Sequence, residues 1–343
     1  MNNPKLIINS PKYIIDEFEY SINFQKFVRV YYLDNNETKF IQKPVSDYCY
    51  TNANEKERNT VELYDPHENR SKYLWRYKVA KGRDLFQARR NNVNYNDIDA
   101  VRRLAVDNNW VPGSTMAGAK TTQEQIDLPI PSYVPAVALD IETSMTIGSP
   151  TNYTAPITAI VLSFNRAGGG HYHKVWLNCE VYKLTDVKTL TDKLAANGVE
   201  LRVNTEDRLL REVFLELRQI NATLVTYNGC DFDLPYFVKR CQVHGIASYF
   251  AKEPNEYFAK FGYSNFPHLD LYKIFKNTTL KLYMFGNAYE RDTLAEVSSA
   301  ILKRNKITID FDSCSGEELV MYNVNDGDLT LSLFEEIINS LLF

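Results

Sequence analysis

Hydrophobic and polar residues alternate along several short segments in the first hundred positions of the chain. KFVRVYYLD (26–34) and TKFIQK (38–43) flank the polar triplet NNE, a pattern typical of a β-hairpin. KYLWRYKVA (72–80) alternates in the same way and predicts another strand. Helical stretches are expected around 84–91 and 97–108. The pattern therefore predicts a strand-rich first part of the chain.

From position 136 the pattern changes to short apolar runs interspersed with longer segments of helical periodicity. AVALDIE (136–142) and ATLVTYN (222–228) are typical of buried strands. Two more strands are predicted at 157–164 and 171–177, joined by the glycine-rich turn AGGG.

Helices are expected between and after these strands. The segment 205–220 predicts an amphipathic helix, in which Thr205 suits the N-cap and Glu206 and Asp207 suit the positive end of the helix dipole. Further helices are expected from Leu234–Pro235 to Gly245, near 290–303, and over 316–342. This order of elements predicts a mixed α/β sheet with helices packed on it.

Residues 112–135 separate the two halves of the chain. This segment contains four prolines, two glycines and many small polar residues, which is typical of a linker or long loop. We therefore place a domain boundary there and expect one domain over 1–130 and a second over 131–343. A chain of 343 residues is long enough for two buried cores.

The composition is that of an ordinary globular protein, with 44% hydrophobic and 24% charged residues. No apolar run reaches the length of a membrane span, and the first residues lack the apolar stretch of a signal peptide. The five cysteines are scattered without a CxxC pair, which argues against a zinc site or a disulfide framework. We expect a soluble cytoplasmic protein with no membrane partner.

The formal net charge of −4 does not indicate a nucleic-acid-binding protein, but the distribution of charge is uneven. Between positions 70 and 103, ten Lys and Arg residues accompany three acids, a local net charge of +7. Such a tract forms a phosphate-attracting patch if its side chains share one face. A solvated basic surface without a ligand is the other interpretation.

Asp140 and Glu142 lie two positions apart at the end of an apolar strand, so their side chains point to the same face. Two carboxylates on one side of a buried strand repel each other unless a cation lies between them. Hard divalent cations such as Mg²⁺ and Mn²⁺ prefer such oxygen ligands. By itself the D-x-E pair is also compatible with a hydrated strand end.

Two further acids follow in characteristic surroundings. In YNGCDFD (227–233), Asp233 lies where a helix begins, which is also compatible with a simple N-cap. In YNVND (322–326), Tyr322 and Asp326 are four positions apart and share one helical face. Aspartate is unfavourable inside a helix, so its presence there suggests a function, although a surface position explains it too.

Taken together, D-x-E, N-x-x-x-F-D and Y-x-x-x-D in this order resemble the Exo I, Exo II and Exo III motifs of family B DNA polymerases. The neighbouring strings LVTYNGCDFDLPYFVKRCQVHGI, HLDLYKIF and DTLAEVSSAILKRNKI are similar to archaeal members of that family. YNDIDAVRRLAVDNNWVPG and LWRYKV extend the similarity upstream. The resemblance thus covers nearly the whole chain.

The resemblance implies a β-rich N-terminal domain followed by a ribonuclease H-like exonuclease domain, an α/β fold with a mixed five-stranded sheet flanked by helices. It implies a 3′→5′ exonuclease that releases nucleoside monophosphates. Tyr322 would orient the attacking water, and Asn228 and Phe232 would contact the terminal nucleotide of DNA. Two Mg²⁺ or Mn²⁺ ions, expected about 3.5–4 Å apart, would be bound by four carboxylates: Asp140, Glu142, Asp233 and Asp326.

Polymerase motifs downstream of the exonuclease are missing, because neither an SLYPS-like string nor Y-x-D-T-D occurs. We therefore expect a polymerase domain on the same longer chain or on a separate subunit. The expected substrate is single-stranded or frayed primer-template DNA, because the terminal base must leave the duplex to reach a buried site. Two alternatives stay open: a non-catalytic DNA-binding and docking module that uses the basic tract, and an enzyme that cuts RNA.

Overall fold

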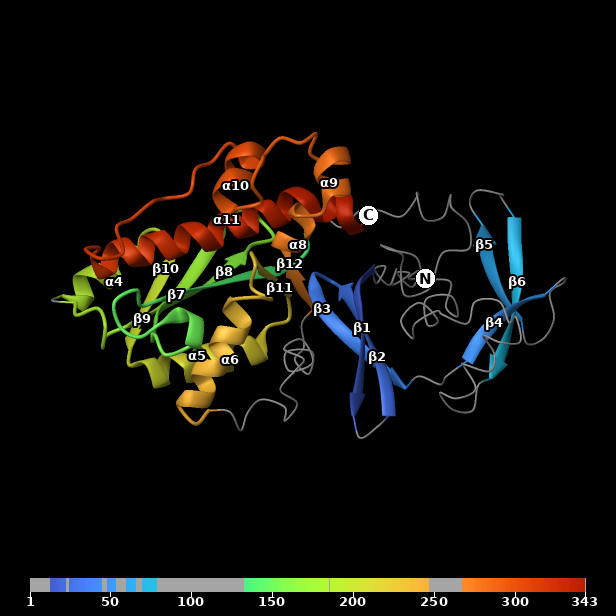
Figure 1. Cartoon of the computed structure of the whole chain (residues 1–343), viewed down its shortest axis with the longest axis horizontal. Helices are drawn as coiled ribbons and strands as arrows, with labels where there is room; N and C mark the ends of the chain where they lie inside the picture. Colours follow the sequence, from blue (N-terminus) through green and yellow to red (C-terminus); the bar gives the residue numbers. More distant parts are fainter. Residues whose placement is uncertain are drawn as a thin grey trace, which may run out of the picture. The chain divides into compact units, whose positions relative to one another are not determined.

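A computed structural model describes residues 13–22, 25–44, 48–53, 60–65, 70–78, 133–184, 186–246 and 267–342 (Figure 1). The chain divides into two compact units, Met1–Pro131 with Leu342–Phe343, and Ser132–Leu341. Within the described residues, no helix combines the length and apolar character needed to cross a bilayer.

The described part of the first unit consists of two antiparallel three-stranded sheets. One has the order β1-β2-β3 and the other β4-β6-β5. The predicted hairpin and the strand near 72–80 are confirmed. The bounds are β1 (Tyr13–Ile22), β2 (Gln25–Asp34), β3 (Glu37–Pro44), β4 (Tyr48–Ala53), β5 (Thr60–Asp65) and β6 (Arg70–Lys78).

The hairpin between β2 and β3 turns at Asn35 and Asn36, whose φ angles are 52° and 61°. Two consecutive left-handed residues match the twist of antiparallel strands, and asparagine tolerates this conformation better than most residues. The predicted helices at 84–91 and 97–108, the linker up to residue 132, and the side chains of the basic tract lie outside the described residues.

The second unit is built on a six-stranded mixed sheet with the order β10-β9-β8-β7-β11-β12. Strands β7, β8 and β9 are antiparallel neighbours, whereas β11 and β12 run parallel to β7, and β10 runs parallel to β9. The bounds are β7 (Ala136–Thr143), β8 (Ile157–Asn165), β9 (His171–Asn178), β10 (Val199–Asn204), β11 (Thr223–Thr226) and β12 (His268–Asp270).

The four strands predicted individually are all present, and the sheet has six strands where the resemblance implied five. Strands β10 and β12 are the two edges of the sheet. β12 contains only three residues, which is too short for an alternating pattern to be recognised.

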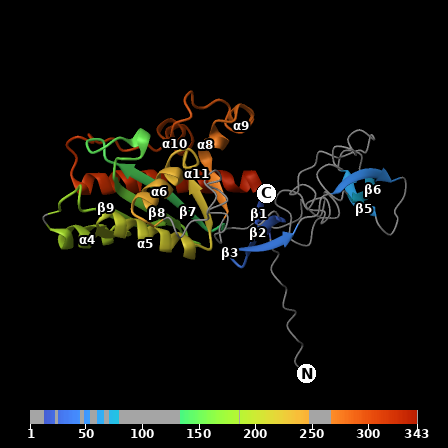
Figure 2. The ribbon, with the colours of Figure 1, turned by 60° about the horizontal axis from the view of Figure 1, so that its bottom comes forward.

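Helices cover both faces of this sheet (Figures 1 and 2). The predicted helices near 205–220, 234–245, 290–303 and 316–342 are confirmed, and α4, α8 and α9 are additional helices. A short 3₁₀ helix, η1 (Pro150–Asn152), follows β7. The bounds are α4 (Val187–Ala195), α5 (Glu206–Gln219), α6 (Asp233–Val243), α8 (Leu271–Phe275), α9 (Thr278–Tyr283), α10 (Leu294–Leu302) and α11 (Gly316–Leu342).

Alternation along β7 assigns its side chains to the two faces of the sheet. Val137, Leu139 and Ile141 pack in a core cluster with residues of α5 and α6. A second cluster joins β8, β9 and β10 to residues of α4 and α11. Because neighbouring strand residues point to opposite faces, Asp140 and Glu142 are directed to the α11 side.

A buried ion pair connects α5 to α6. Glu206 was predicted only to suit the helix dipole, but it is buried and accepts hydrogen bonds from Arg240 Nε (2.7 Å), from Arg240 Nη2 (2.6 Å) and from the Ile157 N–H (2.9 Å). His244 Nε2 lies 3.0 Å from the same carboxylate. Thr205 occupies the N-cap position. Its hydroxyl donates a hydrogen bond to the Asp207 carboxylate and does not cap the helix backbone.

Helix α11 lies unusually close to the sheet at Gly327. A Cβ atom at this position would overlap the side chain of Ser163 on β8 and approach Val161. Glycine is therefore required for this close approach. The contact fixes the height of the helix over the sheet next to Asp326.

Candidate active site

Three carboxylates from two distant segments meet at the α11 side of the sheet. Asp140 and Glu142 come from β7, and Asp326 comes from the middle of α11. One oxygen from each lies within 4.8 Å of an oxygen from each of the others. Residues far apart in the sequence thus form a single acidic cluster.

A hydrogen bond links the strand and the helix inside this cluster. Asn323 Nδ2 donates to Asp140 Oδ2 at 2.7 Å. Asn323 is fully buried and lies three positions before Asp326, so both project from the same side of α11. This bond orients the Asp140 carboxylate and leaves its second oxygen for another partner.

Asp233 approaches the cluster from the first turn of α6 and is only 3% exposed. Its Oδ1 accepts a hydrogen bond of 3.0 Å from the backbone N–H of Ile141, which lies between Asp140 and Glu142 on β7. The interpretation of Asp233 as a plain helix cap is therefore insufficient, because the carboxylate ties α6 to the acidic strand.

Lys306 brings a positive charge to the cluster. Its Nζ lies 2.6 Å from Asp326 Oδ2 and 4.7 Å from the centre of the Tyr322 ring. Tyr322 in turn packs edge-on against Phe311. The predicted pair Tyr322 and Asp326 thus shares one helical face, and Lys306 contacts both members.

The carboxylates are held in an environment that disfavours their charged forms. Burial, followed by the charges of Asp233, Asp326 and Glu142, raises the pKa of Asp140 well above its usual range. Burial is also the main cause that raises the pKa of Glu142 to about 8.

The other two acids are shifted in the same direction. Burial raises the pKa of Asp233 to about 7 although the Ile141 N–H lowers it, and nearby Asp270 and Asp326 add to the rise. Burial raises the pKa of Asp326 to about 6 against the opposing effect of Lys306. Four neighbouring acids with raised pKa values constitute a site that favours a positive partner.

The donor set fits a hard divalent cation. All ligand atoms are carboxylate oxygens, as Mg²⁺ and Mn²⁺ prefer. Asp326 Oδ1 is buried and has no hydrogen-bond partner among the described residues, and Asp326 itself is 3% exposed. A buried acceptor without a donor is costly, and a bound cation would satisfy it.

Comparison with known proteins identifies the family of the chain. The family model for the exonuclease domain of DNA polymerase family B matches residues 93–284, more than half of the chain. The chain belongs to this family. The matched range contains Asp140, Glu142 and Asp233, whereas Asp326 lies beyond it and joins the other acids through the fold.

Curated relatives of the chain are archaeal polymerases. DNA polymerase 1 of Aeropyrum pernix is 31% identical over 62% of this chain and 22% of its own length. DNA polymerase 1 of Saccharolobus solfataricus is 31% identical over 68% of this chain and 24% of its own length. The chain therefore spans about a quarter of the length of these relatives.

A solved structure shows the same fold. The family B DNA polymerase from the hyperthermophilic archaeon Pyrobaculum calidifontis superposes with a TM-score of 0.57 over 96% of this chain and 46% of that chain, at 14% identity. The α/β fold class predicted from the sequence, with helices flanking a mixed sheet, is confirmed by this likeness.

Asn228 and Phe232 occupy the turn between β11 and α6, immediately before Asp233. Asn228 has a left-handed backbone with φ of 71°. The Phe232 side chain is 37% exposed and packs against Tyr236 at 5.4 Å between ring centres. Both are near the acidic cluster in the chain and accessible, as a contact to DNA requires, and their roles stay predictions.

Sequence reasoning missed Lys306, Asn323 and Asp270. Lys306 belongs to the string KRNK, in which no spacing distinguishes this half-buried lysine from its exposed neighbours. Asn323 was recognisable, since it precedes Asp326 by one helical turn. Asp270 lies in a strand too short to be predicted, so its partners could not be anticipated.

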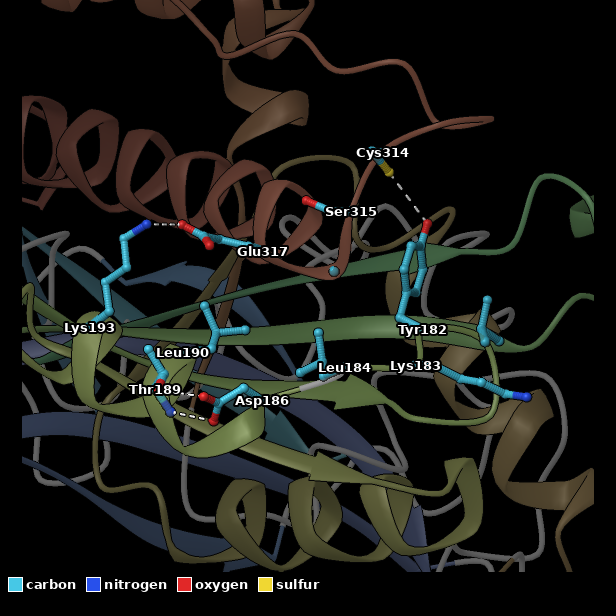
Figure 3. A pocket seen from close by; sticks show the side chains of 12 residues that line it. Tyr182, Lys183, Leu184, Asp186, Thr189, Leu190, Lys193, Cys314, Ser315 and Glu317 are labelled. Atoms are coloured by element: carbon cyan, nitrogen blue, oxygen red, sulfur yellow. Dashed lines mark hydrogen bonds and ion pairs between the residues drawn. The ribbon is translucent and has the colours of Figure 1, made fainter.

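A cavity of about 660 Å³ lies between the segment after β9, α4 and the start of α11 (Figure 3). Glu142 is among the charges that raise the pKa of Tyr182, after burial and Cys314, so this wall lies close to the acidic cluster. Lys193 forms an ion pair with Glu317, and Asp186 accepts a hydrogen bond from the backbone N–H of Thr189 (Figure 3). These lining charges are satisfied within the protein, so we assign the cavity no ligand.

Proposed function

We propose that the second unit is a 3′→5′ exodeoxyribonuclease that hydrolyses the terminal phosphodiester of DNA with the help of two divalent cations. The observation that supports this most strongly is the convergence of Asp140, Glu142 and Asp326, with Asp233 bound to the same strand. Membership of the family supports a nuclease of this general kind.

The four carboxylates are the proposed cation ligands. Asp140, Glu142, Asp233 and Asp326 would hold two Mg²⁺ or Mn²⁺ ions. Such ions neutralise phosphate charge, lower the pKa of water and stabilise a leaving oxygen. Asn323 orients the Asp140 carboxylate through its 2.7 Å hydrogen bond.

Tyr322 would orient the attacking water, because its hydroxyl belongs to the same helical face as Asp326. Burial raises the pKa of this phenol to about 12, so it stays protonated and can donate a hydrogen bond at neutral pH. Asn228 and Phe232 would contact the terminal nucleotide. An exposed aromatic ring offers a stacking surface to an unpaired base.

We infer that the substrate is a single-stranded or frayed 3′ end of primer-template DNA. An unpaired terminus is needed to reach carboxylates that are half-buried or buried, and a mismatch lowers the cost of leaving the duplex. DNA synthesis itself would come from a polymerase domain, either on the same longer chain or on a separate subunit.

The alternative of a non-catalytic docking module is less favoured. Its basis is the basic tract at 70–103, whose side chains lie outside the described residues. In contrast, four neighbouring acids with raised pKa values, of which Asp233 and Asp326 are buried and Asp140 and Glu142 half-buried, lower stability without a cation and have no evident benefit for docking on DNA.

The direct test is incubation of the full chain with Mg²⁺ and a labelled primer-template. We expect release of mononucleotides from the 3′ end, faster from a mismatched than from a paired terminus. An RNA primer of the same sequence distinguishes the two nucleic acids. The proposal would be contradicted if none of these substrates released mononucleotides.

Lys306 offers a prediction of its own. Its ammonium would offset phosphate charge next to Asp326, and hydrogen bonds to charged groups contribute about 1.5–3 kcal/mol. Lys306→Met should therefore lower the rate of mononucleotide release about 10- to 100-fold. The exposed Lys303→Met is the matched control and should retain the rate of the unmodified chain. Equal rates for the two variants would exclude a role for Lys306.

A further inference from the structure

The turn that joins β11 to α6 has a fixed and unusual backbone. Asn228 is left-handed, with φ of 71°. Gly229 has no room for a side chain, because a Cβ atom there would overlap Thr226. Left-handed backbone at a residue other than glycine costs free energy, less for asparagine than for most residues, and hydrogen bonds from the surroundings stabilise it.

Asp270 supplies this support from the neighbouring parallel strand β12. Its Oδ1 accepts the N–H of Asn228 at 2.8 Å, and its Oδ2 accepts the N–H of Cys230 at 2.9 Å. Oδ1 also accepts the N–H of Tyr272 at 3.2 Å and so caps α8. The side chain is buried, with 6% of the residue exposed.

Asp270 is not a member of the acidic cluster. Both of its oxygens accept hydrogen bonds from backbone N–H groups, whereas Asp326 Oδ1 has no partner in the described part of the chain. The turn continues into α6 through the Phe232 N–H, which donates to the Asn228 carbonyl at 3.1 Å. The backbone that Asp270 holds therefore carries Asn228 and Phe232.

We propose that Asp270 is a positioning residue that fixes the surface on which the 3′-terminal nucleotide binds. This inference rests on the proposed nuclease function and specifies one part of it. Asp233 has an independent anchor in the Ile141 N–H. Loss of Asp270 therefore disturbs binding of the DNA end and leaves cation binding intact.

The test compares Asp270→Asn with the full unmodified chain. The asparagine keeps one acceptor oxygen and presents an NH₂ group to the second backbone N–H, so one hydrogen bond is lost. We expect KM for a frayed 3′ end to rise about tenfold, kcat to change less than about threefold, and Mn²⁺ affinity measured by calorimetry to stay the same.

Asn277→Ala is the matched control. Asn277 caps the adjacent helix α9 by accepting hydrogen bonds from the N–H groups of Thr279 and Leu280, and within the described residues its side chain makes no hydrogen bond to the turn. This variant loses a cap of similar kind, so its KM should equal that of the unmodified chain. A KM for Asp270→Asn equal to the control would overturn the inference, as would a fall in kcat and Mn²⁺ affinity at unchanged KM.

Two further measurements separate positioning from general stabilisation. Asn228→Gly removes the side-chain amide of Asn228 but favours a positive φ at this position. If Asp270 acts by positioning Asn228, the rise in KM of the double variant should be smaller than the combined rises of Asn228→Gly and Asp270→Asn. Additive effects would contradict the proposal. Amide exchange of the unmodified chain should show Asn228 and Cys230 protected, and rapid exchange would also contradict it, whatever the variants do. Inactivity of the unmodified chain on every DNA substrate would instead contradict the proposed function.

Discussion

Asp140→Asn should lower the rate of 3′-terminal hydrolysis at least about 1,000-fold while DNA binding persists. The substitution preserves the shape of the side chain and its partner Asn323, but it removes the negative charge at the centre of the cluster. Cations that stabilise developing charge contribute several kcal/mol to a barrier, and about 1.4 kcal/mol corresponds to tenfold in rate.

The matched control is Asp192→Asn, which changes the same residue type at an exposed position on α4. Mononucleotide release from a labelled mismatched primer should be unchanged in this control. Binding is measured with the same primer by fluorescence anisotropy. An Asp140→Asn variant that degrades the primer within about tenfold of the control rate would show that the cluster is not the hydrolytic centre.

Mn²⁺ should stabilise the second unit strongly at pH 8 and weakly at pH 5. Without a cation, the raised pKa values of Glu142 (about 8), Asp233 (about 7) and Asp326 (about 6) mean that the folded chain binds protons which the unfolded chain has released. The contribution of the cluster to stability therefore falls as pH rises from roughly 4 to 8. Above that window the acids are charged and ready for a cation.

A cation at about 100 times its Kd adds roughly 2.7 kcal/mol to the free energy of unfolding. For a unit of this size that corresponds to a rise of about 5–10 °C in Tm at pH 8. At pH 5 protons compete for the same oxygens, and the rise should be below about 2 °C. Differential scanning calorimetry with and without Mn²⁺ measures both values.

Asp140→Asn supplies the control for this experiment. It removes one of the repelling charges, so the cation-free variant should be at least as stable at pH 8 as the unmodified chain. It should also lose most of the Mn²⁺ effect. An equal Tm rise at both pH values, or in the variant, would show that Mn²⁺ acts elsewhere.

Long periodic segments were predictable from the sequence because many residues contribute to each pattern. The apolar stripe of α5 and the whole extent of α11 belong to this class. Short edge strands were not, since the three residues of β12 carry no periodicity and depend on pairing with β11. Strand and helix propensities are overridden by such neighbours.

The acidic positions of the site were predictable, since their spacing relative to strand and helix ends is visible along the chain. Their immediate partners were not. Lys306 reaches Asp326 only after the segment before α11 folds back over the helix, and the Ile141 N–H reaches Asp233 across 92 positions. Contacts of this kind depend on tertiary structure, which no local pattern encodes.

Anomalous diffraction from crystals of the full chain soaked in Mn²⁺ tests the central claim most directly. We expect two anomalous peaks about 3.5–4 Å apart. Each should mark a Mn²⁺ ion bound by oxygens of the four carboxylates, with Asp326 Oδ1 among the ligands. No peak at this cluster at saturating Mn²⁺, or peaks confined to other acids, would contradict it.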